Sequence, residues 1–196
     1  MKAKGFHVFP LFNERANRKE TESMLKKHSP ELVFLNGHGN SDCVTGHNQE
    51  ILIKANDNEQ LLANSITYAL SCSSGKTLGP KAVERGTRAY IGYENEFIFF
   101  ISKEKIRHPE EDKTAEMFLG PANHVVLSLA KGHTVREACS DARKYFYQNV
   151  RKLLTSEVSP DEKQYIRFLL WNMQNLVAHG DTATKALIIP RPSFVV

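Results

Sequence analysis

The sequence predicts an α/β protein in which helices cover both faces of a mostly parallel central sheet. Short apolar runs of the kind found in buried parallel strands alternate with polar and amphipathic stretches of helical character. A chain of 196 residues suits one domain that buries about 70% of its unfolded surface. No repeat, low-complexity tract or linker interrupts the pattern, so residues 1–196 are expected to form a single domain.

The predicted strands are apolar runs bounded by small or polar residues. They cover residues 5–12, 32–36, 66–70, 89–93 and 186–189, and a small hairpin in the polar stretch 40–60 has residues 51–54 as its second arm. The run 32–36 is almost continuously apolar, which is typical of a strand buried in a parallel sheet. We therefore expect this run, with 66–70 and 89–93, to form the core of the sheet.

The predicted helices begin or end at residues that suit a helix terminus. A short helix runs from Asn17 to Ser29, and others span residues 76–85, 135–154 and 160–178. The terminal signals are Asn17 with Glu20, Gly86, and two capping boxes, Thr134 to Glu137 and Ser159 to Glu162. Cys139 and Trp171 are expected on buried helix faces, and the charged stretch 102–113 is expected to be an exposed loop.

Composition narrows the functional classes. The net charge is +4, and residues 1–30 hold seven Lys or Arg against three Glu, too weak a basic bias for a dedicated nucleic-acid binder. Three cysteines without framework spacing indicate a reducing compartment. No apolar stretch approaches the roughly 20 residues of a membrane span, and the first residues lack the pattern of a signal peptide. We therefore expect a cytoplasmic protein, without membrane, nucleic acid, metal or cofactor.

Two predicted core strands end in chemically competent side chains. The run 32–36 leads into Gly37, His38 and Gly39, and the run 66–70 leads into Ser71 and Cys72. Ligands and chemistry gather outside the carboxyl ends of strands in an open parallel sheet. Two adjacent strands with these ends would place an imidazole beside a thiol, which is the arrangement that a cysteine nucleophile requires.

Small residues around this pair suit the same chemistry. Glycine before and after His38 tolerates a sharp backbone turn and lets a substrate approach closely. The backbone N–H groups near Gly39 and at Cys72 would then hold the oxyanion of a tetrahedral intermediate. The run Ser73-Ser74-Gly75 keeps the loop after Cys72 small as it opens into a helix.

These motifs resemble those of the caspase-fold cysteine peptidases of clan CD. Leu-Asn-Gly-His-Gly followed by Leu-Ser-Cys-Ser-Ser-Gly is similar to their His-Gly and Cys pair, and nearest to the separase-like and CHAT-domain members. Residues 81–92 are similar to the helix, Gly, strand, Gly stretch after their nucleophile. His179-Gly180-Asp181 is similar to the Gly-Asp motif near the end of gingipain-like domains. The resemblance covers roughly residues 5–190 and implies a caspase-like three-layer sandwich.

The resemblance implies a cysteine endopeptidase that cleaves protein or peptide substrates through an acyl-enzyme. It assigns the nucleophile to Cys72 and the general base and acid to His38. Cys72 follows His38 by 34 residues, against roughly 50 in caspases, and Leu70-Ser71 stands where caspases have Gln-Ala. Cleavage after Asp is therefore not expected. A regulatory partner and an activating cut in the loop 102–113 are further implications of the family.

Substrate preference rests on three residues. In relatives the residue two before the nucleophile lines the substrate pocket, and here it is Leu70. Glu94 and Glu96 follow the strand 89–93, close to where relatives carry acidic residues. A carboxylate at the floor of the pocket would favour Arg or Lys in the substrate.

The sequence also leaves two other functions open, a zinc site and a non-catalytic interaction module. His38, Cys43, His47 and Cys72 are ligand types that suit zinc, although their spacing matches no zinc knuckle or ribbon. The chain also suits a non-catalytic caspase-like interaction module within a larger assembly. Many relatives carry a further strand before the one predicted at residues 5–12. Its absence here fits a sheet edge completed by a partner or by a lost segment, or a compact variant of the fold.

Overall fold

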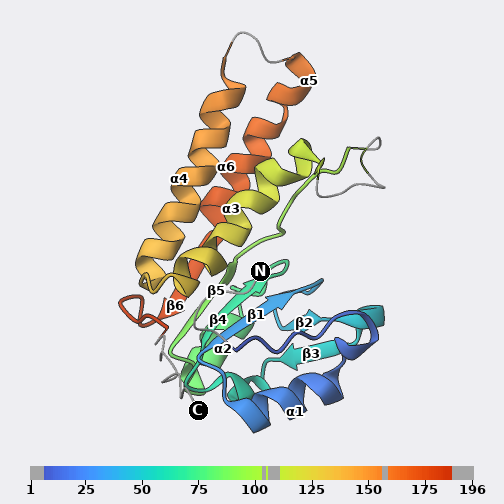
Figure 1. Ribbon diagram of the computed structural model, residues 1–196, viewed down its shortest axis with the longest axis vertical. Helices are drawn as coiled ribbons and strands as arrows, with labels where there is room; N and C mark the ends of the chain where they lie inside the picture. Colours follow the sequence, from blue (N-terminus) through green and yellow to red (C-terminus); the bar gives the residue numbers. More distant parts are fainter. Residues whose placement is uncertain (1–6, 103–104, 106–110, 156–158, 187–196) are drawn as a thin grey trace, which may run out of the picture.

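The computed structural model describes residues 7–102, 105, 111–155 and 159–186 (Figure 1). Its central sheet has the strand order β1-β4-β5-β6. The strands are β1 (Leu32–Asn36), β4 (Ile66–Leu70), β5 (Ala89–Tyr93) and β6 (Leu176–Gly180). The first three are parallel and β6 runs antiparallel to β5. The predicted α/β class with a mostly parallel sheet is therefore confirmed.

The remaining elements surround this sheet. The hairpin pairs β2 (Cys43–Thr45) with β3 (Ile51–Lys54). The helices are α1 (Arg18–His28), α2 (Leu78–Glu84), α3 (Lys113–Ala130), α4 (Val135–Leu153), α5 (Pro160–Lys163) and α6 (Tyr165–Asn175), with 3-10 turns η1 (Asn13–Arg15), η2 (His47–Gln49) and η3 (Glu59–Leu62).

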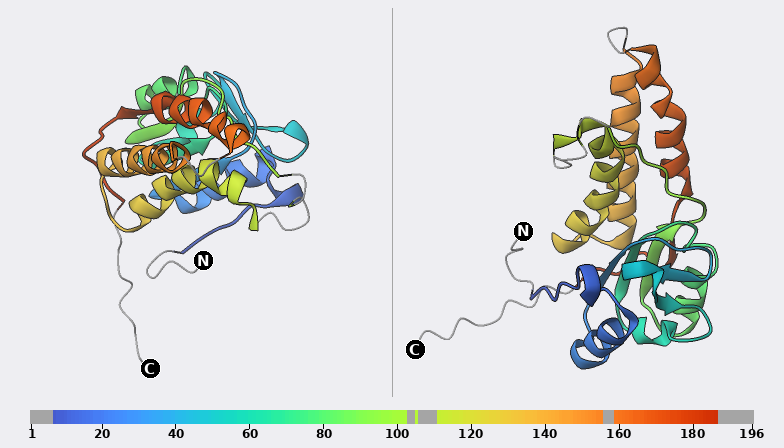
Figure 2. Two further views of the ribbon diagram at one scale, coloured as in Figure 1. Left: turned by 90° about the horizontal axis from the view of Figure 1, so that it is seen from above. Right: turned by 90° about the vertical axis from the view of Figure 1, so that its right-hand side faces the viewer.

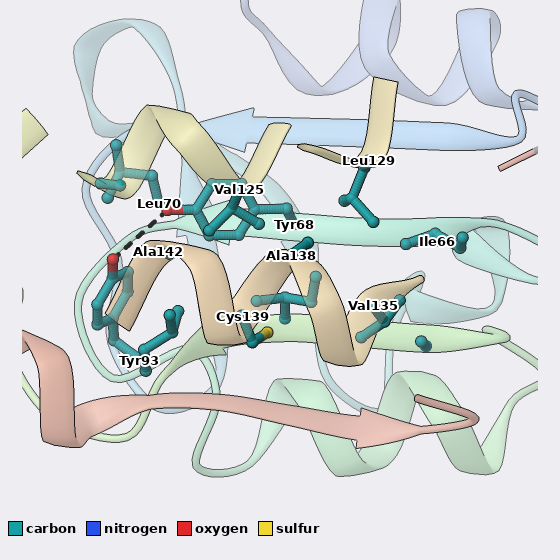
Figure 3. Close-up of a cluster of buried hydrophobic side chains, with 14 of the residues drawn as sticks. Ile66, Tyr68, Leu70, Tyr93, Val125, Leu129, Val135, Ala138, Cys139 and Ala142 are labelled. Carbon is teal, nitrogen blue, oxygen red and sulfur yellow. Dashed lines mark hydrogen bonds between the residues drawn. The ribbon is translucent and has the colours of Figure 1, made fainter. Parts of the chain in front are cut away.

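Alternate residues along β4 and β5 enter opposite cores, as the period of two in an extended chain requires. One face of β4 and β5 packs against α3 and α4 through the cluster shown in Figure 3, which includes Tyr68, Tyr93 and Cys139. The other face packs against α1, α2 and the hairpin through residues such as Ala69 and Tyr90. Helices thus lie on both faces of the sheet, and Cys139 is a core residue as predicted.

A helical extension projects beyond the sheet (Figures 1 and 2). It is formed by α3, α4 and α6, and a second aromatic-rich core centred on Phe118, Phe146 and Leu169 holds it together. Helix α6 ends directly before β6, whose first residue pairs with Tyr93, the last residue of β5. The extension therefore rises from the carboxyl edge of the parallel strands.

The predicted helix termini are largely confirmed. The Asn17 side chain accepts the Glu20 N–H at 2.9 Å, and the helix that it caps ends at His28. Both capping boxes form, at Thr134 with Glu137 and at Ser159 with Glu162. Gly86 follows α2 with φ +100°, a left-handed conformation that glycine adopts without strain.

Three predictions were wrong in part, and a fourth falls mostly outside the described residues. Residues 7–12 form no strand, because Pro10 lacks an N–H for a ladder, and residues 5–6 lie outside the described range. Of the predicted strand 186–189 only Ala186 is described, and the antiparallel strand β6 was not predicted. The helix 160–178 is divided into α5 and α6 and stops at Asn175. Trp171 is 40% exposed and donates its indole N–H to the Glu96 carbonyl.

Candidate active site

The register of the sheet places His38 and Cys72 at one edge. Asn36, the last residue of β1, pairs with Leu70, the last residue of β4. The Gly37 N–H extends this parallel ladder by one bond to the Leu70 carbonyl oxygen, at 3.3 Å. His38 and Cys72 each come two residues after the last register pair. The predicted juxtaposition of the two segments is therefore present in the fold.

The two strands separate directly after this last bond. In a parallel ladder the next bond would join the Cys72 N–H to the Gly37 carbonyl. That bond does not form, and within the described residues the Cys72 N–H has no other acceptor. The amide of the candidate nucleophile is thus free to bind an oxygen atom of a ligand.

The segment after β1 leaves its partner strand and pairs with β2. The His38 carbonyl accepts the Thr45 N–H at 2.8 Å, and the Asn40 N–H donates to the Cys43 carbonyl at 3.1 Å. These bonds flank Gly39, so its own N–H points away from β2. Among the described residues no group accepts that N–H. A second amide without an acceptor therefore lies next to His38 in the segment after β1.

Close packing explains both glycines around His38. A Cβ on Gly37 would overlap the Thr45 carbonyl oxygen, and one on Gly39 would overlap the Ser71 Oγ and the Cys43 carbonyl oxygen. Neither glycine is among those with positive φ. Close packing of the protein itself therefore accounts for glycine at both positions, and the unusual dihedral angles expected there are not present.

The turn after Cys72 is fixed by the ends of β5 and β6. Ser73 adopts a left-handed conformation with φ +56°, and its N–H donates to the Asn95 carbonyl at 3.0 Å. The Gly75 N–H donates to the Tyr93 carbonyl at 2.9 Å. A Cβ on Gly75 would lie 2.6 Å from a methyl group of Val177, so this position accepts only glycine without a shift.

Cys72 is the accessible thiol of the three. All three cysteines are free, but Cys43 and Cys139 are buried while Cys72 is half-buried. Burial also raises the pKa of Cys139 to about 11, which keeps that thiol protonated at neutral pH. His38 is exposed at the same edge. No hydrogen bond joins the His38 ring to the Cys72 thiol in the described structure, and such bonds commonly shorten when substrate binds.

The residues predicted to line the pocket separate into two groups. Glu94 and Glu96 are exposed and flank Asn95, whose carbonyl holds the Ser73 N–H. They therefore lie on the loop that contacts the Cys72 turn. Leu70 is only 6% exposed and packs in the core between the sheet and α3 and α4 (Figure 3). Its side chain supports the strand end and presents almost no surface to a substrate.

Helix α6 holds the loop that carries the two carboxylates. The Glu94 N–H donates to the Asn175 carbonyl at 2.9 Å, and the Asn172 side chain both accepts from and donates to the backbone of Ile98. Asn172 is fully buried, so this amide is committed to the loop. The helical extension thus contributes directly to the wall of the site.

His179 also contacts the segment after Cys72, although its sequence motif indicates no role for its side chain. It lies on β6, and its ring Nε2 is 2.7 Å from the Gly75 carbonyl oxygen. The contact joins residues 104 positions apart, so no local pattern indicates it.

Metal binding finds no support in the arrangement. Among the described residues, no three His, Cys, Asp or Glu side chains lie where they could share one ion. The buried Cys43 thiol instead donates to the Asn40 side chain at 3.5 Å. The zinc alternative therefore has no ligand set here.

Comparisons of the chain with protein-family models, with curated proteins and with solved structures found no match. No helix in the described ranges combines the length and apolar character needed to cross a membrane. Function must therefore be inferred from the geometry of the site.

Proposed function

We propose that this protein is a cysteine endopeptidase with Cys72 as nucleophile and His38 as its general base and acid. The observation that supports the proposal is the end of the β1-β4 ladder: His38 and Cys72 each follow the last register pair by two residues, and among the described residues the Gly39 and Cys72 amides have no acceptor. A thiol, an imidazole and two free N–H donors at one edge are the groups that acyl transfer requires.

The proposed reaction proceeds in two steps. His38 takes the proton of the Cys72 thiol, and the sulfur attacks the carbonyl carbon of the substrate peptide bond. The Gly39 and Cys72 N–H groups stabilise the resulting oxyanion. The intermediate collapses as His38 returns the proton to the leaving amine, which leaves a thioester on Cys72. His38 then deprotonates a water molecule that hydrolyses this thioester and restores the thiol.

The fold proposed for this activity is the caspase-like sandwich. The order of His before Cys on neighbouring parallel strands, with helices on both faces of the sheet, supports this assignment. A cytoplasmic location and control by a regulatory partner belong to the same proposal. The stretch 102–113, where an activating cut was predicted, lies mostly outside the described residues.

Thiol labelling tests the proposed nucleophile. With sub-stoichiometric iodoacetamide at neutral pH, we expect Cys72 to react at least about 10-fold faster than Cys43 or Cys139, because it is accessible and has a base beside it. His38→Ala should reduce that rate without exposing the other two cysteines. The measurement is peptide mass spectrometry of labelled, folded protein. Equal labelling of all three thiols would favour a non-catalytic interaction module.

A peptide panel tests the proposed preference for basic residues. Because Glu94 and Glu96 flank the loop residue that contacts the Cys72 turn, we expect fluorogenic peptides with Arg or Lys before the cut to be hydrolysed about 10-fold faster than those with Leu. Glu94→Gln and Glu96→Gln should reduce this ratio. Glu116→Gln, an exposed carboxylate on α3, is the control. Faster cleavage after Leu or Asp would reject the preference.

A further inference from the structure

We propose that His179 is a positioning residue that holds the Cys72 turn through Gly75; this inference rests on the proposed peptidase function. The His179 Nε2 lies 2.7 Å from the Gly75 carbonyl oxygen. A carbonyl oxygen can only accept, so Nε2 carries the hydrogen and donates it. Within the described residues no other donor reaches this carbonyl.

The His179 ring packs close to Gly79 and Tyr90. His179 pairs with Tyr90 across β5 and β6. A Cβ on Gly79, in α2, would lie 2.9 Å from the His179 Cδ2 and 2.9 Å from the Tyr90 Cδ1. Glycine inside a helix costs stability relative to alanine. The space that Gly79 provides for the imidazole is a physical reason for glycine at this position.

His179 completes a set of three anchors on the turn. The Ser73 N–H and the Gly75 N–H are held by carbonyls of Asn95 and Tyr93, at and just beyond the end of β5. The Gly75 carbonyl is held from β6 by His179. Hydrogen bonds therefore hold both the N–H and the carbonyl of Gly75, which lies three positions after the nucleophile. Without the third anchor a buried carbonyl loses its donor, and the turn is held less firmly on the side that faces β6.

The matched pair His179→Phe and His179→Gln tests this role. Phenylalanine keeps an aromatic ring without a donor, whereas glutamine keeps an N–H at similar reach. We expect His179→Phe to lower kcat about 10- to 100-fold with KM changed less than about threefold, since a small displacement of a reacting group is costly. We expect His179→Gln to retain most of the activity. His133→Phe is the control, because it removes another histidine hydrogen bond, to Ser128 Oγ at 2.9 Å.

Hydrogen exchange needs no substrate, so it tests the role of His179 independently of the proposed peptidase activity. Hydrogen exchange of the Ser73 and Gly75 amides should be faster in His179→Phe than in the wild type, and unchanged in His179→Gln and His133→Phe. Gly79→Ala should behave like His179→Phe, because its methyl group displaces the ring. If the wild type cleaves no peptide, the proposed function fails while exchange still tests the anchor. Unchanged exchange in His179→Phe, or equal loss in the glutamine variant, would overturn the inference.

Discussion

Cys72→Ala is expected to abolish peptide cleavage while the protein stays folded. Loss of a covalent nucleophile commonly lowers kcat by about 10⁴-fold or more, because the remaining groups only bind and polarise the substrate. The Cys72 side chain is half-buried and makes no hydrogen bond in the described structure, so its removal should change the free energy of unfolding by less than about 1 kcal/mol. The measurements are fluorogenic peptide hydrolysis and thermal unfolding.

The same variant gives the control for finding substrates. A cell lysate exposed to the wild type should gain new protein N-termini that are missing after exposure to Cys72→Ala, and the residue before each cut reports the preference. Cys139→Ala is a matched cysteine variant: it removes a buried thiol in the core and should cost stability but not catalysis. Equal sets of new termini from wild type and Cys72→Ala would refute the proposed nucleophile.

Local sequence signals were sufficient for much of the fold. The three apolar runs 32–36, 66–70 and 89–93 coincide with β1, β4 and β5. The two central strands β4 and β5 are buried on both faces and are therefore apolar along most of their length, whereas β1 is an edge strand on which Phe34 is exposed. The capping boxes were equally reliable, since a cap depends on residues only three positions apart.

The errors arose where distant contacts decide the structure. Residues 176–178 continue the apolar pattern of α6, yet they form the start of β6, because pairing with β5 supplies hydrogen bonds that a longer helix would not. Trp171 fits a buried stripe by periodicity but uses its indole N–H to hold the loop at Glu96. Neither outcome is visible in a local window.

In the candidate site, too, local signals succeeded and long-range contacts were missed. His38 and Cys72 could be picked out because each directly follows a predicted strand, and the parallel register brings both to one edge of the sheet. The run 66–70 predicted a core strand, but the pocket role assigned to Leu70 was wrong because its side chain lies in that core, and no sequence signal indicated that His179 reaches Gly75. Burial and long-range anchoring depend on which helix covers which face of the sheet, so they required the structure.

Gly39→Ala is expected to impair both catalysis and stability. A methyl group on Gly39 would overlap the Ser71 Oγ and the Cys43 carbonyl, which is itself bonded to the Asn40 N–H and cannot move freely. The backbone must shift, and the free Gly39 N–H shifts with it. We expect kcat/KM to fall about 10²- to 10³-fold, as for loss of one oxyanion donor. The free energy of unfolding should fall by about 1–3 kcal/mol.

Two further variants separate the contribution of geometry from that of lost stability. Gly86→Ala strains a left-handed residue after α2, away from the site, and should lower stability without lowering kcat/KM. Ser71→Ala removes one of the two atoms that the new methyl group would overlap, and the buried Ser71 Oγ has no partner to lose. The double variant Gly39→Ala/Ser71→Ala should therefore be more active than Gly39→Ala alone, a positive coupling that a double-mutant cycle measures. A Gly39→Ala variant with wild-type kcat/KM would mean that the Gly39 amide takes no part in the reaction. Any backbone shift at Gly39 would move its N–H relative to a bound oxyanion and would lower the rate if that N–H were a donor.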